Sequence, residues 1–250
     1  MAAREHPYRA LCYLFISLVT FLALQYLVVV MHELTHSSMA WALGDMKSPL
    51  DIVWGDPLTM TGWDEGVDYD QLYTQGRNLQ AAMIGFCPLA MHSLIAGLGI
   101  LHMRGKWLFH RKWLFHAVYW FVVGNLMELV AYIFMRSFSG HGDVGHFNHG
   151  TGLSPWWVFI IGSGFLTWGL TLFFRGSLPR LQSLFATDNP PSKWMILILT
   201  AFLLFLWGSG IRVMAYVTGP QWLFGLIGIP AFILTVSLFR PGRTEKSGKK

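Results

Sequence analysis

The sequence predicts an all-α integral membrane protein with about six transmembrane helices. Of its 250 residues, 54% are hydrophobic and only 12% are charged, whereas soluble domains carry about 25% charged residues. The hydrophobic residues collect in long blocks, and a run of about 18 or more with few charges can cross a bilayer as a helix. A single polytopic membrane domain over residues 1–240 is the simplest arrangement.

Six apolar blocks carry this prediction, and we expect a helix in each: Leu11–Leu43, Leu79–His102, Trp113–Met135, Pro155–Phe174, Trp194–Val217 and Trp222–Phe239. The first block is longer than the apolar region of a secretory signal and lacks a small-residue cleavage site before His32, so we expect it to be retained. At about 1.5 Å per residue it exceeds the hydrocarbon thickness, so it tilts or its last turns leave the membrane.

Basic residues separate alternate blocks instead of gathering on one face, which indicates membrane topology and not nucleic-acid binding. They are Arg4, Arg9, Arg104, Lys106, Arg111, Lys112, Arg175, Arg180, Lys193, Arg240, Arg243, Lys246, Lys249 and Lys250. The positive-inside rule places these segments, and therefore both termini, in the cytoplasm. Residues 241–250 form a basic tail that we expect to be disordered.

The loop of residues 44–78 is predicted to be extracytoplasmic, because it contains seven acidic residues against only Lys47 and Arg77. Its length, prolines and glycines predict a short hairpin or a re-entrant element, and loops this long are often functional. The second outer loop, Arg136–Ser154, is rich in glycine and histidine. Cys12 and Cys87 lie in apolar blocks and imply no disulfide framework.

The segment His32–His36 reads HELTH and stands near the end of the first block. On a helix, His32 and His36 share a face and can present two imidazoles to one tetrahedral metal, with Glu33 beside them as the general base for a metal-activated water. A chance HExxH is expected in about 1% of chains of this composition. The alternative is that both histidines are interfacial polar residues satisfied by water, but ionisable groups in a membrane helix usually mark a functional site.

A catalytic zinc needs a third protein ligand near the same membrane face. Asp143 is the first choice, because it lies in the second outer loop between glycines that permit close approach of the backbone. Glu128, inside the third block, is the rival. The lesser candidates are His141, His146 and His149, for each of which a flexible polar loop is the preferred interpretation.

Three segments resemble the site-2 protease family of intramembrane zinc metalloproteases, particularly its compact six-span members without a PDZ domain. The HELTH helix and its small-residue continuation to Gly44 resemble the family's first motif. Ala81–Ala90 is similar to its Ala-Gly-Pro segment, and Met135–Asp143 is similar to the loop that delivers an aspartate ligand. For Asn125, the resemblance implies a substrate-orienting role, and a helix–helix hydrogen bond is the alternative.

The resemblance implies a zinc-dependent endopeptidase in which His32, His36 and Asp143 hold Zn²⁺ and Glu33 activates water. Its substrate would be a membrane protein, cleaved within or near the bilayer. Two alternatives remain open at this point: a zinc hydrolase that acts on a lipid amide or ester, and a non-catalytic metal-binding membrane protein. Charge topology predicts that the zinc lies near the extracytoplasmic face.

Overall fold

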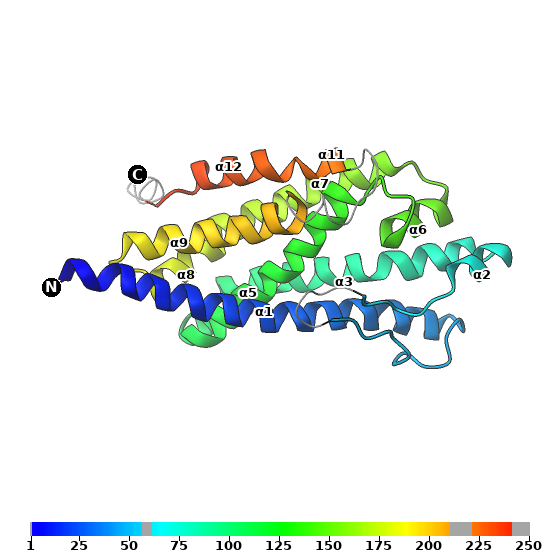
Figure 1. Cartoon of the computed structure of the whole chain (residues 1–250), viewed down its shortest axis with the longest axis horizontal. Coiled ribbons are helices and arrows are strands. Elements are labelled where there is room, and N and C mark those ends of the chain that lie inside the picture. The colour runs from blue at the N-terminus through cyan, green and yellow to red at the C-terminus, as the bar shows by residue number, and fades with distance from the viewer. Residues whose placement is uncertain (1, 57–61, 211–221, 242–250) are drawn as a thin grey trace.

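In the computed structural model, which describes residues 2–56, 62–210 and 222–241, the chain is almost entirely helical (Figure 1). The helices are α1 (Ala2–Ala42), α2 (Tyr69–Thr74), α3 (Asn78–Arg104), α4 (Lys106–Phe109), α5 (Lys112–Val130), η1 (Ala131–Met135), α6 (Gly142–Thr151), α7 (Pro155–Leu172), η2 (Phe173–Ser177), α8 (Leu178–Phe185), α9 (Pro190–Ala201), η3 (Phe202–Gly210), α11 (Trp222–Gly225) and α12 (Gly228–Leu238). The segments named η are π-helical.

Five helical segments are long and apolar enough to cross a membrane: Tyr8–Ala42, Asn78–Arg104, Lys112–Met135, Pro155–Phe185 and Pro190–Ser209. They coincide with the first five predicted blocks, which confirms a helical protein of membrane character. The sixth block forms a shorter apolar segment, Leu223–Leu238. Residues 211–217 of the fifth predicted block and residues 242–250 of the basic tail lie outside the described residues.

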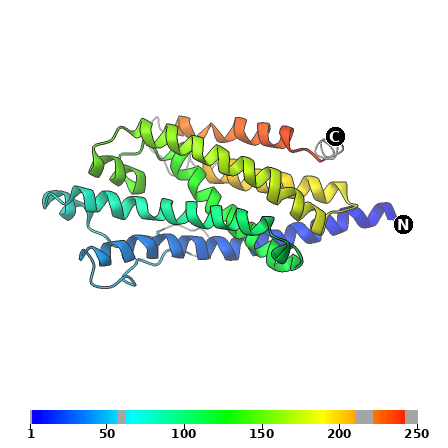
Figure 2. The same cartoon turned by 180° about the vertical axis from the view of Figure 1, so that it is seen from behind.

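The span that contains α5 is the most deeply buried of the five and forms the centre of the bundle. It crosses obliquely between α1 and α3 on one side and α7 and α9 on the other (Figures 1 and 2). Its aromatic side chains Phe115, Tyr119 and Trp120 are fully buried. The Tyr119 hydroxyl bonds to Thr200 Oγ1 on α9 at 2.8 Å, so even the polar group of this core residue has a partner.

The basic connections gather at one end of the bundle. The guanidinium of Arg180 donates to the carbonyl oxygen of Met103 at 2.6 Å and joins α8 to the end of α3. Near it, the ring of Tyr13 on α1 stacks on Phe185 of α8, with ring centroids 4.7 Å apart. The start of α1 and the end of α12 lie at this same end (Figure 1).

The opposite end holds the two long connections of acidic or polar character. There an ion pair between Arg77 and Asp45 ties the start of α3 to the end of α1. Arg77 also donates to the carbonyl oxygen of Leu43, the residue after α1, at 3.1 Å, which gives a partner to a carbonyl that the helix end leaves without one.

The second outer connection is a helix, not the flexible polar loop that its glycines and histidines suggest. Residues Gly142–Thr151 form α6, which folds back against α3 (Figure 2). The helix ends at Gly152, whose φ of +68° is the left-handed conformation that commonly terminates helices. Its buried side chains, Asp143, Val144 and Asn148, recur at helical spacing, a pattern that is present in the sequence but that the many glycines obscure.

The first outer connection contains the predicted hairpin. Val53 and Asp64 form an antiparallel bridge, with N–H···O distances of 2.8 and 3.2 Å. Gly66, at φ +71°, lies against the backbone before the bridge: a Cβ atom added to it would lie 2.8 Å from the carbonyl oxygen of Asp51. The two sides of the loop therefore pack closely.

This hairpin runs back alongside α1 instead of projecting away from it (Figure 1). Ser37 Oγ donates to the carbonyl oxygen of Pro49 at 2.7 Å. Farther along, the ring of Trp63 meets the ring of Tyr26 edge to face, with centroids 5.5 Å apart. Tyr26 lies at the middle of the apolar segment Tyr8–Ala42, so the hairpin reaches the depth of the centre of this span.

Candidate metal centre

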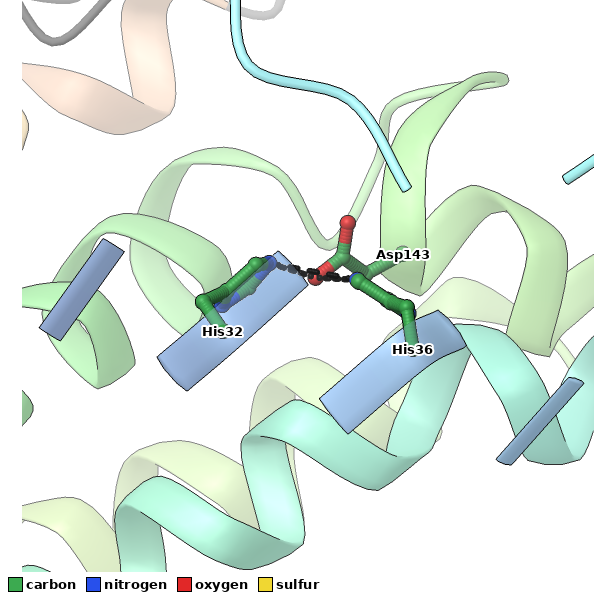
Figure 3. A group of neighbouring side chains, drawn as sticks. All are labelled: His32, His36 and Asp143. Carbon is green, nitrogen blue, oxygen red and sulfur yellow. Dashed lines mark hydrogen bonds and ion pairs between the residues drawn. The ribbon is translucent and has the colours of Figure 1, made fainter. Parts of the chain in front are cut away.

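Two histidines of α1 and one aspartate of α6 meet in the bundle (Figure 3). His32 and His36 lie one helical turn apart, and their Nε2 atoms are 3.2 Å from each other. Asp143 Oδ2 lies 3.0 Å from His32 Nε2 and 3.3 Å from His36 Nε2. The side chains are buried, at 5%, 1% and 9% relative exposure respectively, so bulk water solvates little of this polar cluster.

Small residues bring α6 close enough to deliver Asp143. A Cβ atom added to Gly150 would lie 2.8 Å from the Cβ of Ala82 and would also overlap the carbonyl oxygen of Asn78. Since Cβ atoms do not approach so closely, glycine permits the two helix backbones to pack against each other here. The last turn of α6 is thereby held against the first turns of α3.

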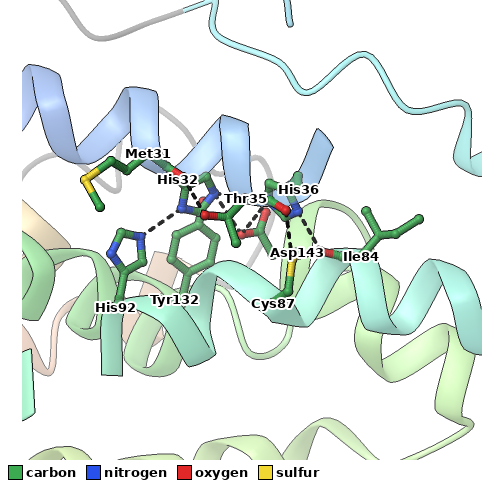
Figure 4. A network of polar contacts seen from close by, with 9 residues as sticks. All are labelled: Met31, His32, Thr35, His36, Ile84, Cys87, His92, Tyr132 and Asp143. Atoms are coloured by element: carbon green, nitrogen blue, oxygen red, sulfur yellow. Dashed lines mark hydrogen bonds and ion pairs between the residues drawn. The ribbon is translucent and has the colours of Figure 1, made fainter. Parts of the chain in front are cut away.

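A hydrogen bond fixes the orientation of His36. Its Nδ1 lies 2.7 Å from the carbonyl oxygen of Ile84 on α3 (Figure 4). A carbonyl oxygen only accepts, so Nδ1 carries the proton and donates it. The lone pair of the neutral imidazole is then on Nε2, the atom that faces His32 and Asp143. Metal-ligating histidines are usually oriented in this way by a carbonyl or carboxylate behind the ring.

The three facing atoms fit a tetrahedral cation. Two ligands bound to zinc at about 2.0–2.1 Å with tetrahedral angles are about 3.3 Å apart, and the three separations here are 3.0, 3.2 and 3.3 Å. Two imidazole lone pairs and a carboxylate that face one another repel unless a positive charge, either a proton or a metal ion, lies among them. Two nitrogens and one carboxylate oxygen are a donor set that zinc accepts.

The carboxyl group of Asp143 is ionised in this arrangement. Burial alone would favour its neutral form, but without a metal ion the protonated rings of His36 and His32 attract the carboxylate, outweigh burial and hold the pKa of Asp143 well below its usual range. The carboxylate is therefore available as an anionic ligand at neutral pH.

Glu33 follows His32 directly and is also buried, at 9% relative exposure. It lies in α1 between the two histidines, at the position of the general base in an HExxH motif.

Tyr132 is a site residue that the sequence analysis missed. Its ring stacks nearly parallel on His32, with centroids 5.3 Å apart and 13° between planes. Its hydroxyl lies 3.2 Å from His32 Nε2. Tyr132 belongs to η1, and π-helical turns occur frequently at functional sites. One hundred residues separate it from His32, so no local pattern could have linked the two.

The other candidates for the third metal ligand contact residues outside the cluster of His32, His36 and Asp143. Glu128 accepts a hydrogen bond from Gln25 at 2.6 Å and does not belong to the cluster that could hold a metal. His146 stacks on Tyr69 with ring centroids 3.6 Å apart, and its Nδ1 lies 2.9 Å from the hydroxyl of Tyr73. It therefore joins α6 to α2.

The remaining two histidines of this connection also lie outside the cluster. His141 is exposed. His149 meets the ring of Tyr73 edge to face, with centroids 4.4 Å apart. Of the four candidates for a third ligand in the outer loop, only Asp143 lies beside both HELTH histidines.

No family model, no curated protein and no solved structure matches the chain.

Proposed function

We propose that this chain is a zinc-dependent metallopeptidase of the site-2 protease type, which hydrolyses a peptide bond within or near the membrane. One observation carries the proposal: the HELTH histidines and Asp143 form a buried triangle of lone-pair donors with the separations of a tetrahedral zinc site. An HExxH glutamate next to such a triangle supports catalysis over a purely structural metal, because a structural zinc needs no general base.

The chemistry follows from the groups around the triangle. Bound zinc would lower the pKa of a water molecule and polarise the scissile carbonyl. Glu33 takes a proton from the attacking water and returns it to the leaving amine. The hydroxyl of Tyr132, 3.2 Å from His32 Nε2, loses that nitrogen as an acceptor once the lone pair binds a cation. It then donates to the carbonyl oxygen on which negative charge develops.

The depth of the cluster supports a membrane substrate. Six residues of α1, Ser37–Ala42, continue beyond His36 within the same apolar segment. At 1.5 Å per residue they place the cluster about 9 Å inside the end of the helix. A peptide bond that reaches Glu33 would then belong to a membrane-embedded or membrane-proximal segment.

The proposed topology has six crossings, with Leu223–Leu238 as the last and shortest, and both termini in the cytoplasm. The gathering of Arg180 and the other basic connections at the end of the bundle where α1 begins supports this orientation. The metal centre then lies nearer the extracytoplasmic face, on the side of the acidic loop.

Lipid hydrolysis is the rival that shares this metal centre. A cavity of about 760 Å³ between α3 and α7, lined by apolar residues such as Phe86, Leu94 and Trp157, is of a size that can take an acyl chain. Helical spacing, however, puts most of the lining residues of α3 on the side opposite His92, which faces the metal centre. The cavity therefore gives lipid hydrolysis no advantage over peptide hydrolysis.

One comparison tests the proposal. Membranes of cells that carry the wild-type protein or Glu33→Gln are analysed for both proteins and lipids, after metal analysis has verified that the variant keeps its zinc. Accumulation of an uncut membrane protein with Glu33→Gln is the expected result. Accumulation of a lipid amide or ester instead would establish the rival activity. Identical proteomes and lipidomes would mean that the metal centre is not catalytic.

A further inference from the structure

Behind His32, away from Asp143, lies a row of buried polar side chains that reaches into the centre of the bundle. His32 Nδ1 lies 3.0 Å from His92 Nε2 on α3 (Figure 4). His92 Nδ1 lies 2.8 Å from Asn125 Oδ1 on α5. Asn125 Nδ2 donates to the carbonyl oxygen of Phe121 at 2.8 Å. Three helices thus contribute to one continuous chain of hydrogen bonds.

The donor and the acceptor of each hydrogen bond in this row can be assigned by starting from the carbonyl oxygen of Phe121. The carbonyl of Phe121 can only accept, so the amide NH₂ of Asn125 must face it and the amide oxygen must face His92. This oxygen accepts, so His92 carries its proton on Nδ1 and has its lone pair on Nε2. That lone pair accepts from His32, which must then be protonated on Nδ1.

The consequence reaches the metal centre. A neutral imidazole protonated on Nδ1 has its lone pair on Nε2, and Nε2 is the atom of His32 that faces His36 and Asp143. The chain therefore selects the one tautomer of His32 that can bind a cation there. The opposite tautomer would point an N–H at the cluster and leave His92 without a donor.

These hydrogen bonds matter because the side chains that make them are buried. His92 is completely buried and Asn125 is 1% exposed, so no bulk water can replace a missing partner. A buried polar group without a partner is destabilising, and each hydrogen bond in this row leaves the next side chain with its partner. The carbonyl oxygen of Ile84 accepts directly from His36 Nδ1 and so fixes its tautomer. For His32, the same role falls to the side chains of His92 and Asn125.

We propose that His92 and Asn125 are positioning residues that hold His32 in the tautomer and orientation required for zinc. The inference rests on the metal centre of the proposed function, and it adds two residues to the machinery that no ligand motif includes. Partners of this kind behind a ligating histidine typically change metal affinity by about 10–100-fold when they are removed.

Zinc affinity of the purified protein, measured by competition with a chromogenic chelator, tests the proposal. We expect His92→Leu and Asn125→Leu to bind zinc about 10–100-fold more weakly than the wild type. His92→Gln should restore most of the affinity, because its amide can accept from His32 and donate to Asn125. Equal affinities in the wild type, His92→Leu and Asn125→Leu would overturn the proposal.

His116→Leu is the matched control. His116 is also a buried histidine in the bundle, bonded to the Tyr13 hydroxyl at 2.8 Å and to Thr20 Oγ1 at 3.2 Å, but it makes no contact with the chain behind His32. Its loss should leave zinc affinity unchanged. If His116→Leu weakens zinc binding as much as His92→Leu does, the effect is general destabilisation and the proposal falls.

A spectroscopic measurement needs no variant that must fold. In zinc-free wild-type protein labelled with ¹⁵N-histidine, the ring nitrogen shifts should show a proton on Nδ1 of His32, whether or not Nε2 is protonated as well, and an Nδ1 without a proton would overturn the proposal. If the proposed zinc site itself is wrong, the wild type will bind no zinc, whatever the tautomer of His32. That outcome differs from failure of the inference on His92 and Asn125, in which the wild type and both variants bind zinc equally well.

Discussion

Gly85 on α3 lies directly against the backbone of Asp143 on α6. A Cβ atom added to Gly85 would lie 2.6 Å from the carbonyl oxygen of Asp143 and 3.1 Å from the Cβ of His146. Real Cβ atoms do not come so close to a backbone oxygen. The missing side chain of Gly85 therefore determines how near the Asp143 carboxylate can come to His32 and His36.

Gly85→Ala should move Asp143 away from the two histidines. The obstructing atom belongs to the backbone, so α6 itself must shift, and we expect zinc affinity to fall about tenfold or more. Chelator competition measures the change. Gly97→Ala on the same helix is the control, because nothing lies within 4 Å of its added Cβ. An unchanged affinity in Gly85→Ala would show that this contact does not position the ligand.

The two candidate carboxylates should differ when each is removed. Asp143→Ala is expected to lose bound zinc, because its Oδ2 contacts both histidine nitrogens. Glu128→Gln is expected to keep one zinc per chain, because Glu128 bonds to Gln25 instead. Metal analysis of the purified proteins decides between them. Zinc retained in Asp143→Ala and lost in Glu128→Gln would reverse the assignment of the third ligand.

Tyr132→Phe should separate catalysis from metal binding. The ring that stacks on His32 remains, so zinc affinity should be unchanged. Loss of the hydroxyl should slow processing of the substrate that accumulates in Glu33→Gln by about 10²–10³-fold, the usual effect of removing one oxyanion donor. Tyr119→Phe, which removes the buried hydroxyl bonded to Thr200, should leave processing unchanged. Normal processing by Tyr132→Phe would exclude the proposed role.

The contact of His146 with α2 should weaken in acid. Burial lowers the pKa of His146 in the folded protein, whereas the value in an unfolded chain is about 6.5. As the pH falls through 6.5, the unfolded state binds the proton first, so the folded state loses stability. The Tm of the wild type should therefore drop between pH 7.5 and pH 5.5. His146→Phe keeps the stacking on Tyr69 and should show a smaller drop; equal drops would contradict this assignment.

Hydropathy was enough to predict the five long helices, because a membrane helix is apolar over its whole length and needs no knowledge of its neighbours. The HELTH motif was equally readable, since both histidines and the glutamate lie within five residues. Asp143 required a topological argument, and the structure brings it to the motif as that argument expected. Ligation of zinc by these residues stays a prediction.

The missed features depend on contacts between distant residues. The glycines around Asp143 predicted irregular backbone, but at positions such as Gly150 the same residues permit a helix to pack closely on α3. His92 and Tyr132 come from other helices, 60 and 100 residues beyond His32. Periodicity within one helix carries no information on which partner its polar side chains will meet.

The hairpin beside α1 has a consequence for hydration. Non-helical backbone is tolerated at membrane depth only where protein buries it or where it lines a space that holds water, because lipid offers its N–H and C=O groups no partner. The bridge between Val53 and Asp64 satisfies two N–H groups, and the ring of Trp63, next to the bridge, meets Tyr26 near the middle of the apolar segment of α1. A bilayer around this span would leave the other N–H and C=O groups of the connection dependent on protein or water for partners.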